Sequence, residues 1–96
     1  MEAFNSAEIG LDLPAIPEWS QHGQRIQRVY QFSGFMDSID FVDRIAGKAQ
    51  RMKHYPEIDI RGDAVTLTLT THEEGGLTDN DFILARECDE TFSLFR

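Results

Sequence analysis

The clearest pattern in the chain is an alternation of apolar and polar residues over residues 65–72. Val65, Leu67 and Leu69 fall on one face of an extended segment, and the threonines and His72 fall on the other. Alternation with a period of two is typical of a strand that is buried on one face only. We therefore expect a strand over residues 65–72 whose last residue, His72, projects from the polar face.

Three shorter segments also have the alternation or the flanking turn residues that are typical of strands. They are residues 19–22, residues 25–32 and residues 58–61. The Gly62-Asp63 pair predicts a tight turn between the last of these segments and the strand that contains His72. Because the neighbouring strands of a hairpin run in opposite directions, the sheet should be antiparallel.

Two segments have the spacing of amphipathic helices. From Asp37, which we expect to be the N-cap, apolar residues recur at helical spacing until about Lys53, and Pro56 follows. A second helix should start after Thr78, with Asp81 three residues later as a variant capping box. Each helix should bury one apolar stripe.

The order of these elements, ββαββα, predicts an α+β domain with two layers. Each strand has one apolar face, so a four-stranded antiparallel sheet should carry both helices on that face. Residues 7–13 are compatible with a short additional helix that Pro14 would end. The length of 96 residues suits a single domain, 1–96, in which we expect residues 1–18 to be loosely structured.

Composition and charge limit the kinds of molecule that the protein can be expected to bind and the cellular compartment in which it is expected. The net charge of −8 argues against nucleic acid and against an anionic membrane surface, because phosphates require a basic patch. The chain has no run of about 18 apolar residues that could span a membrane, and its start lacks the features of a signal peptide. With Cys88 as the only cysteine, we expect a cytoplasmic protein without an intrachain disulfide.

His54 and His72 are the strongest candidates for chemistry. Two imidazoles that meet at one face of a small sheet would form a proton-transfer site, because histidine titrates near neutral pH. Each candidate also has a simpler explanation. His54 would complement a helix dipole, His72 would be a surface residue, and Asp81 would be a cap. His22, which stands beside Gly23, receives no role at this stage.

Metal binding and nucleophilic catalysis are less favoured. His54, His72, Asp81 and Cys88 are metal-ligand residue types, but no HxxxH or CxxC spacing occurs and Cys88 should face the core. We therefore expect no metal. No Gly-x-Ser-x-Gly elbow is present either, so a serine nucleophile is not indicated.

Three segments resemble, in their order and spacing, the pterin-4a-carbinolamine dehydratases. They are His54-Tyr55-Pro56, residues 65–72 and residues 75–81. Trp19, residues 26–32 and the helix that starts at Asp37 are also similar to that family. The resemblance therefore covers roughly residues 19–90, and the ordered set is more specific than any one segment.

The resemblance implies a hydro-lyase that dehydrates 4a-hydroxytetrahydropterin to a quinonoid dihydropterin, without a metal or redox cofactor. It implies a homodimer or homotetramer. By position, His54 and His72 would be the acid–base pair and Asp81 would belong to the site, while the choice of acid and base stays open. The residues that would surround the pterin are Tyr55, Pro56, Thr71 and Trp19. Tyr55 stands where many members have a second histidine, and Gln50 where an acidic residue is frequent.

Proteins with this resemblance include some that act by binding, as assembly factors or as dimerisation cofactors of transcription factors. A non-catalytic binding protein is therefore the alternative function. A binding module would have little chemical need for both His54 and His72, so the sequence favours the enzyme.

Overall fold

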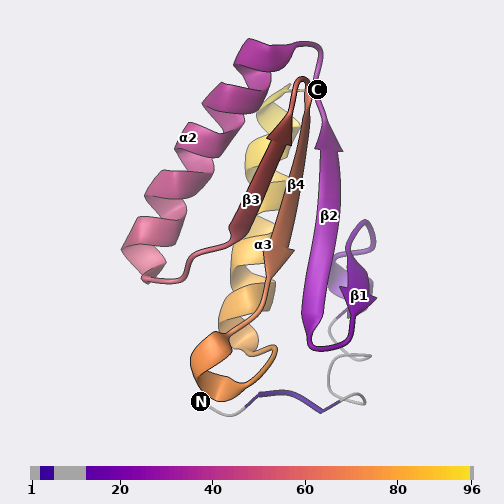
Figure 1. The fold of residues 1–96 in the computed structure, drawn as a ribbon, viewed down its shortest axis with the longest axis vertical. Helices are drawn as coiled ribbons and strands as arrows, with labels where there is room; N and C mark the ends of the chain where they lie inside the picture. The colour runs from indigo at the N-terminus through magenta and orange to yellow at the C-terminus, as the bar shows by residue number, and fades with distance from the viewer. Residues whose placement is uncertain (1–2, 6–12, 96) are drawn as a thin grey trace.

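The centre of the molecule is an antiparallel sheet, shown in Figure 1. The structure is a computed structural model and describes residues 3–5 and 13–95. The strands of these residues are β1 (Ser20–His22), β2 (Arg25–Gln31), β3 (Glu57–Arg61) and β4 (Ala64–Leu69). Their spatial order is β1-β2-β4-β3, and every neighbouring pair is antiparallel. The predicted sheet is therefore confirmed.

Two helices cover one face of this sheet, as predicted. They are α2 (Phe35–Met52) and α3 (Asp79–Phe92), and they lie on the same side in Figure 1. In the part of the chain that the structure describes, three short 3-10 turns accompany them: η1 (Leu13–Ala15), η2 (His72–Glu74) and η3 (Ser93–Phe95). The result is the expected two-layer α+β domain. None of the helices among the described residues is long and apolar enough to cross a membrane.

The core lies between the sheet and the helices. The inward face of β4 supplies the alternating apolar residues predicted from the sequence, and all three are fully buried: Val65, Leu67 and Leu69. Aromatic rings from β2 and α2 pack beside them, with the centroids of Tyr30 and Phe41 4.8 Å apart. The outward face of the sheet is mostly polar, with the exposed Val29 and the half-buried Ala64 as its apolar residues.

The start of α2 differs from the prediction. Gly34 is the N-cap, with extended backbone, and Asp37 lies inside the first turn. The prediction of Asp37 as the cap was wrong because Phe35 and Met36 join the helix ahead of it. The Asp37 carboxylate still lies near the helix N-terminus, where its charge complements the helix dipole.

The end of β4 also differs. The strand stops at Leu69, and His72 begins the turn η2 instead of ending the strand. The physical reason is the partner strand: Leu69 pairs with Ile26, and β2 begins only one residue before Ile26. Beyond this point the chain has no extended partner and closes into the η2 loop, which a single bridge between Thr71 and Gly76 holds together.

The N-terminal segment is only partly described. The expected short helix over residues 7–13 lies outside the described residues except for Leu13, which starts η1. Ile16 is almost fully buried, and the ring of Phe4 lies 5.7 Å from that of Phe82.

Candidate functional site

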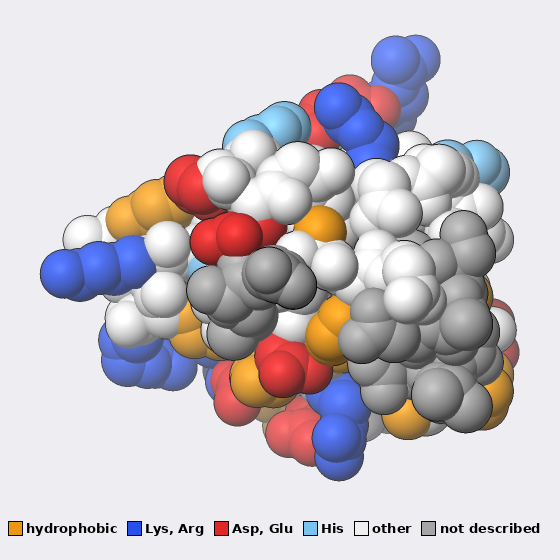
Figure 2. Space-filling view, turned by 90° about the horizontal axis from the view of Figure 1, so that it is seen from below, with side chains coloured by type: hydrophobic (Ala, Val, Ile, Leu, Met, Phe, Trp, Pro, Cys, Tyr) orange, Lys and Arg blue, Asp and Glu red, His pale blue; other side chains and the backbone are white. Residues whose placement is uncertain are grey.

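His54 and His72 line one cavity of about 160 Å³, between the loop after α2 and the start of η2. The other lining residues are Lys53, Tyr55, Thr70 and Glu73. Figure 2 views this end of the molecule and shows acidic, basic and hydrophobic side chains interspersed with backbone and other side chains. The fold thus brings the two histidines together, as the sequence reasoning expected.

The end of α2 determines where His54 lies. Lys53 adopts the left-handed conformation with φ 53°, and its backbone N–H bonds back to the carbonyls of Ala49 and Gln50. The N–H of His54 donates to the Ala49 carbonyl as well, at 3.1 Å. A left-handed residue at a helix end reverses the chain sharply. The residue after the helix therefore points inward, and His54 is buried although it belongs to a loop.

Asp81 is the buried partner of His54. Its Oδ1 lies 2.5 Å from His54 Nε2, and the Asp81 side chain is completely buried. Its Oδ2 accepts bonds from the Thr71 hydroxyl at 2.7 Å and from the Thr78 backbone N–H at 3.0 Å. Asp81 also forms the predicted capping box with Thr78 at the start of α3. The same carboxylate therefore caps the helix and holds the histidine.

This arrangement fixes the protonation pattern of the neutral His54 ring. An ionised carboxylate can only accept hydrogen bonds, so Nε2 carries the proton that is shared with Asp81. The other ring nitrogen, Nδ1, is then unprotonated, and it has no partner among the residues that the structure describes. A neutral imidazole held in one tautomer by a carboxylate is a suitable general base.

Thr71 supports Asp81 from the other side. Its hydroxyl donates to Asp81 Oδ2 and lies 2.8 Å from the Thr78 hydroxyl, which can donate to it in turn. Thr71 is buried and does not line the cavity. Its position therefore indicates a supporting role for a residue that we had expected to contact the substrate.

His72 has a different environment from that of His54. It is exposed, and its imidazole makes no hydrogen bond to any described residue. The loop around it is well defined, because the backbone N–H groups of Thr71 and Gly76 each donate to the other residue's carbonyl, at 3.0 and 3.1 Å. His72 is thus available to a ligand on a firmly closed loop.

The remaining expected residues divide into two groups. Tyr55 lines the cavity, is 62 % exposed, and donates its hydroxyl to Gln50 at 3.3 Å. Pro56 is half-buried next to it but does not line the cavity. The fold does not bring Trp19 to this place. The indole is buried, packs edge-on to Tyr30, and donates to Asp89 at 3.0 Å.

Three lining residues were missed from the sequence: Lys53, Thr70 and Glu73. Each adjoins or shares a face with a histidine that was identified. In the alternating pattern Thr70 falls on the same strand face as His72. Lys53 directly precedes His54, and Glu73 directly follows His72. Their closeness in sequence to His54 and His72 was the signal that could have identified these lining residues.

Other chemistry finds little support among the described residues. No group of three histidine, cysteine, aspartate or glutamate side chains there is placed to hold a metal ion. Cys88 lies in the core, and desolvation, followed by the charge of Asp89, raises its pKa to about 12. Its sulfur therefore stays a thiol at neutral pH and is not an activated nucleophile.

Comparison with known proteins gives a consistent result. The family described as "Pterin 4 alpha carbinolamine dehydratase" matches residues 2–91. A protein of Nocardia farcinica, provisionally named a pterin-4-alpha-carbinolamine dehydratase, is 44 % identical over 93 % of this chain and 94 % of its own length. One of Thermomicrobium roseum with the same name is 41 % identical over 97 % of this chain and its whole length.

A solved structure has a closely similar fold. It is described as a transcriptional coactivator/pterin dehydratase from Brucella melitensis and superposes with a TM-score of 0.90. The two chains are 27 % identical, and the match covers 94 % of this chain and 98 % of the other.

Proposed function

Since this chain belongs to the family of the pterin-4a-carbinolamine dehydratases, we propose that it dehydrates 4a-hydroxytetrahydropterin to the quinonoid dihydropterin by histidine acid–base catalysis. The observation that carries the proposal is the cavity that His54, fixed by the buried Asp81, shares with His72, whose imidazole has no hydrogen-bond partner among the described residues.

The reaction requires two proton transfers at neighbouring atoms. The hydroxyl on C4a leaves as water after it gains a proton, and N5 loses its proton as the C4a=N5 double bond forms. Groups that exchange protons near neutral pH suit both transfers, and imidazole is the side chain that does so without a large shift of its pKa.

We assign His54 to the N5 proton. Asp81 accepts from Nε2, so the neutral ring offers its Nδ1 lone pair as the base. After it takes the proton, the ring keeps its hydrogen bond to Asp81 through Nε2. Asp81 acts through His54 and is therefore a positioning residue.

We assign His72 to the hydroxyl. Its exposed imidazole has no described hydrogen-bond partner, so it can be protonated from solvent and then donate to the leaving group. The water that leaves can exit directly, because the cavity is open to solvent. Tyr55, which lines the same cavity, would contact the pterin ring.

The wider setting belongs to the same proposal. We propose a cytoplasmic protein that needs no metal or redox cofactor, because acid–base chemistry at C4a and N5 transfers no electrons to the protein. Its partner is the small pterin, and we propose that the chain works as a homodimer or homotetramer.

A dehydratase assay on chemically prepared 4a-hydroxytetrahydropterin tests this function. The expected result is a clear acceleration over the spontaneous reaction in buffer, followed by the absorbance change of the quinonoid product. A rate equal to that in buffer would contradict the enzyme.

The competing function is a non-catalytic binding protein. The similar Brucella protein is described as a transcriptional coactivator as well as a pterin dehydratase, which is consistent with this alternative. The histidine–aspartate pair supports the enzyme, because docking to a protein does not require a tautomer to be fixed.

A further inference from the structure

Among the described residues, Lys53 is the one residue other than glycine that has left-handed backbone. Its φ is 53°, a conformation that glycine adopts readily and that a Cβ disfavours. Residues other than glycine that are held in this conformation cluster at functional sites. A lysine at this place lowers the stability relative to glycine, so its side chain should have a use that offsets the loss.

Two structural roles do not account for the Lys53 side chain. A cation at a helix C-terminus complements the helix dipole, but Arg51 already supplies one in the last turn of α2. The cap at the end of α2 uses the Lys53 backbone N–H, which every residue except proline has. Neither role requires a lysine in left-handed backbone.

Lys53 belongs to the wall of the reaction cavity, by which we mean the cavity of about 160 Å³ that His54 and His72 line. The lysine side chain has three N–H donors and no acceptor. The Lys53 ammonium makes no hydrogen bond or ion pair with a described residue, and Glu73, which lines the same cavity, is not paired with it. Lys53 therefore offers the reaction cavity a cationic donor that no described residue uses.

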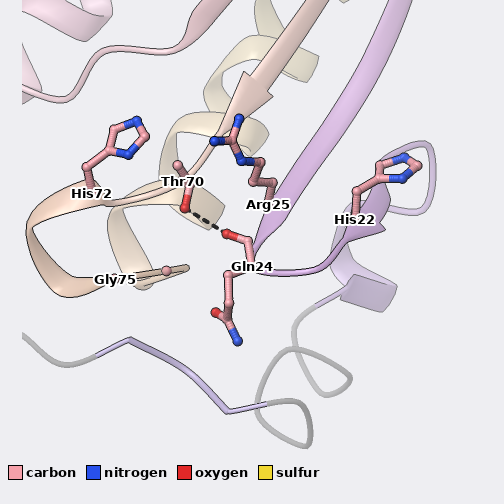
Figure 3. Close-up of a pocket in the computed structure, with 7 residues that line it drawn as sticks. His22, Gln24, Arg25, Thr70, His72 and Gly75 are labelled. Carbon is pink, nitrogen blue, oxygen red and sulfur yellow. Dashed lines mark hydrogen bonds between the residues drawn. The ribbon is translucent and has the colours of Figure 1, made fainter.

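Arg25, the cation on the other side of His72, does not serve the same space. It lines a neighbouring cavity, which Figure 3 shows together with His72, and its guanidinium is paired with Glu57 at 2.8 Å. Of the described lysines and arginines, Lys53 alone lines the reaction cavity. A ligand group that needs a cationic donor there must therefore be bound by Lys53.

The pterin ring has a matching acceptor close to the atom that His54 serves. In the proposed reaction His54 takes the proton of N5. C4 and N5 are both bonded to C4a, and the carbonyl oxygen on C4 leaves the ring on the same side as N5. Because Lys53 directly precedes His54 and has a flexible four-carbon stem, its ammonium can reach this oxygen while His54 meets N5.

We propose that Lys53 binds the C4 carbonyl oxygen of the pterin and thereby makes the site specific for 4-oxopteridines over 4-aminopteridines. This inference rests on the proposed function, which puts the ring in the reaction cavity. A hydrogen bond from a charged donor to a carbonyl oxygen is one of the stronger kinds. An amino group at C4 instead directs N–H groups toward the ammonium, which cannot accept them.

A binding experiment tests this contact without relying on turnover. The ligands are 2-amino-6-methyl-7,8-dihydropteridines, one with an oxo group and one with an amino group at C4. Both lack the C4a hydroxyl and cannot be dehydrated. Isothermal titration calorimetry of the unmodified protein should show tighter binding of the oxo compound by about tenfold or more, the value of one hydrogen bond to a charged group.

Two variants assign this preference to Lys53, and they are needed because the amino compound also lacks the N–H at N3. Lys53→Met removes the ammonium and keeps most of the stem. Lys53→Gly removes the whole side chain and suits left-handed backbone, so its urea midpoint should be no lower than that of the unmodified protein. Both variants should bring the ratio of the two affinities toward one.

The matched control is Lys48→Met, which removes another lysine of α2. Lys48 is paired with Glu87 at 3.0 Å and does not line the reaction cavity. This variant should keep the ratio of the unmodified protein. Circular dichroism confirms that each variant is folded.

The outcomes separate this inference from the proposed function. A ratio near one in the unmodified protein, an unchanged ratio in both Lys53 variants, or an equal loss in Lys48→Met overturns the Lys53 contact. A ratio that depends on Lys53 in a protein that does not accelerate dehydration supports the contact and rejects the enzyme. If neither compound binds, both proposals fall.

Discussion

At the scale of single residues, the site depends on Asp81 performing two tasks. Its Oδ2 caps α3 through the Thr78 N–H, and its Oδ1 holds His54. The sequence predicted the cap from the Thr78-x-x-Asp81 spacing. The contact with His54 spans 27 positions of the chain, and no local pattern reveals a pair so distant. The family resemblance indicated that Asp81 belongs near the site, and in the structure its contact there is the hydrogen bond to His54.

The substitution Asp81→Asn should reduce kcat by up to about 10⁴-fold, the loss seen when the histidine of a catalytic triad is held in the wrong tautomer. If the amide oxygen accepts from Thr78 and Thr71, the amide nitrogen faces His54 and donates to Nε2. The imidazole proton then moves to Nδ1, and the ring can no longer act as a base there. Steady-state dehydratase kinetics measure the loss.

The matched control is Asp79→Asn, in the same helical turn but exposed. It removes a similar contribution to the helix dipole and should leave kcat within about twofold. Equal kcat values for the two variants would show that Asp81 has only its capping role.

At the scale of elements, the sequence correctly predicted that each main helix and strand exists. It was less accurate about the residues at which α2 begins and β4 ends. The alternation over residues 65–72 correctly gave the faces of β4, but it could not reveal that pairing stops with Ile26 and Leu69. That limit is set by where β2 begins, 40 or more positions earlier in the chain. His72 consequently lies on the turn η2, and it still lines the same cavity as His54.

Two glycines, Gly47 and Gly62, test the backbone conformations that the structure assigns to α2 and to the β3–β4 turn. Neither Gly47, inside α2, nor Gly62, in the β3–β4 turn, would bring an added Cβ closer than an ordinary contact. Gly62 has φ 61°, whereas Gly47 does not have positive φ. Gly47→Ala should therefore stabilise the fold by about 0.5–1 kcal/mol, since alanine is the better helix former.

The same change at the turn should have the opposite sign. Gly62→Ala should destabilise by about 1 kcal/mol or more, because a Cβ disfavours left-handed backbone. Urea denaturation measures both free energies of unfolding. A shift in the same direction for both variants would contradict the backbone assignment.

At the scale of the whole molecule, the described residues leave two edges and one face of the sheet uncovered. Nearly every residue of the edge strand β3 is exposed, and Val29 is 59 % exposed on the outward face among polar neighbours. Unpaired strand edges are surfaces on which a second chain can add. The negative charge of −8 opposes close association, so the expected contact must bring compensating pairs or backbone bonds.

We therefore expect self-association into a dimer or tetramer. Light scattering coupled to size-exclusion chromatography, at two protein concentrations, should give two or four times the mass of the chain. A single-chain mass at both concentrations would contradict this expectation. Ile58→Lys, which adds a charge to the exposed edge strand β3, should shift the population toward the single chain.

The most direct measurement of the central claim is kcat/KM of His72→Ala relative to the unmodified protein. His72 is exposed and has no described hydrogen-bond partner, so its removal should leave the melting temperature nearly unchanged. If it protonates the leaving hydroxyl, kcat/KM should fall by about 100-fold or more. A folded variant as active as the unmodified protein would contradict the proposed site.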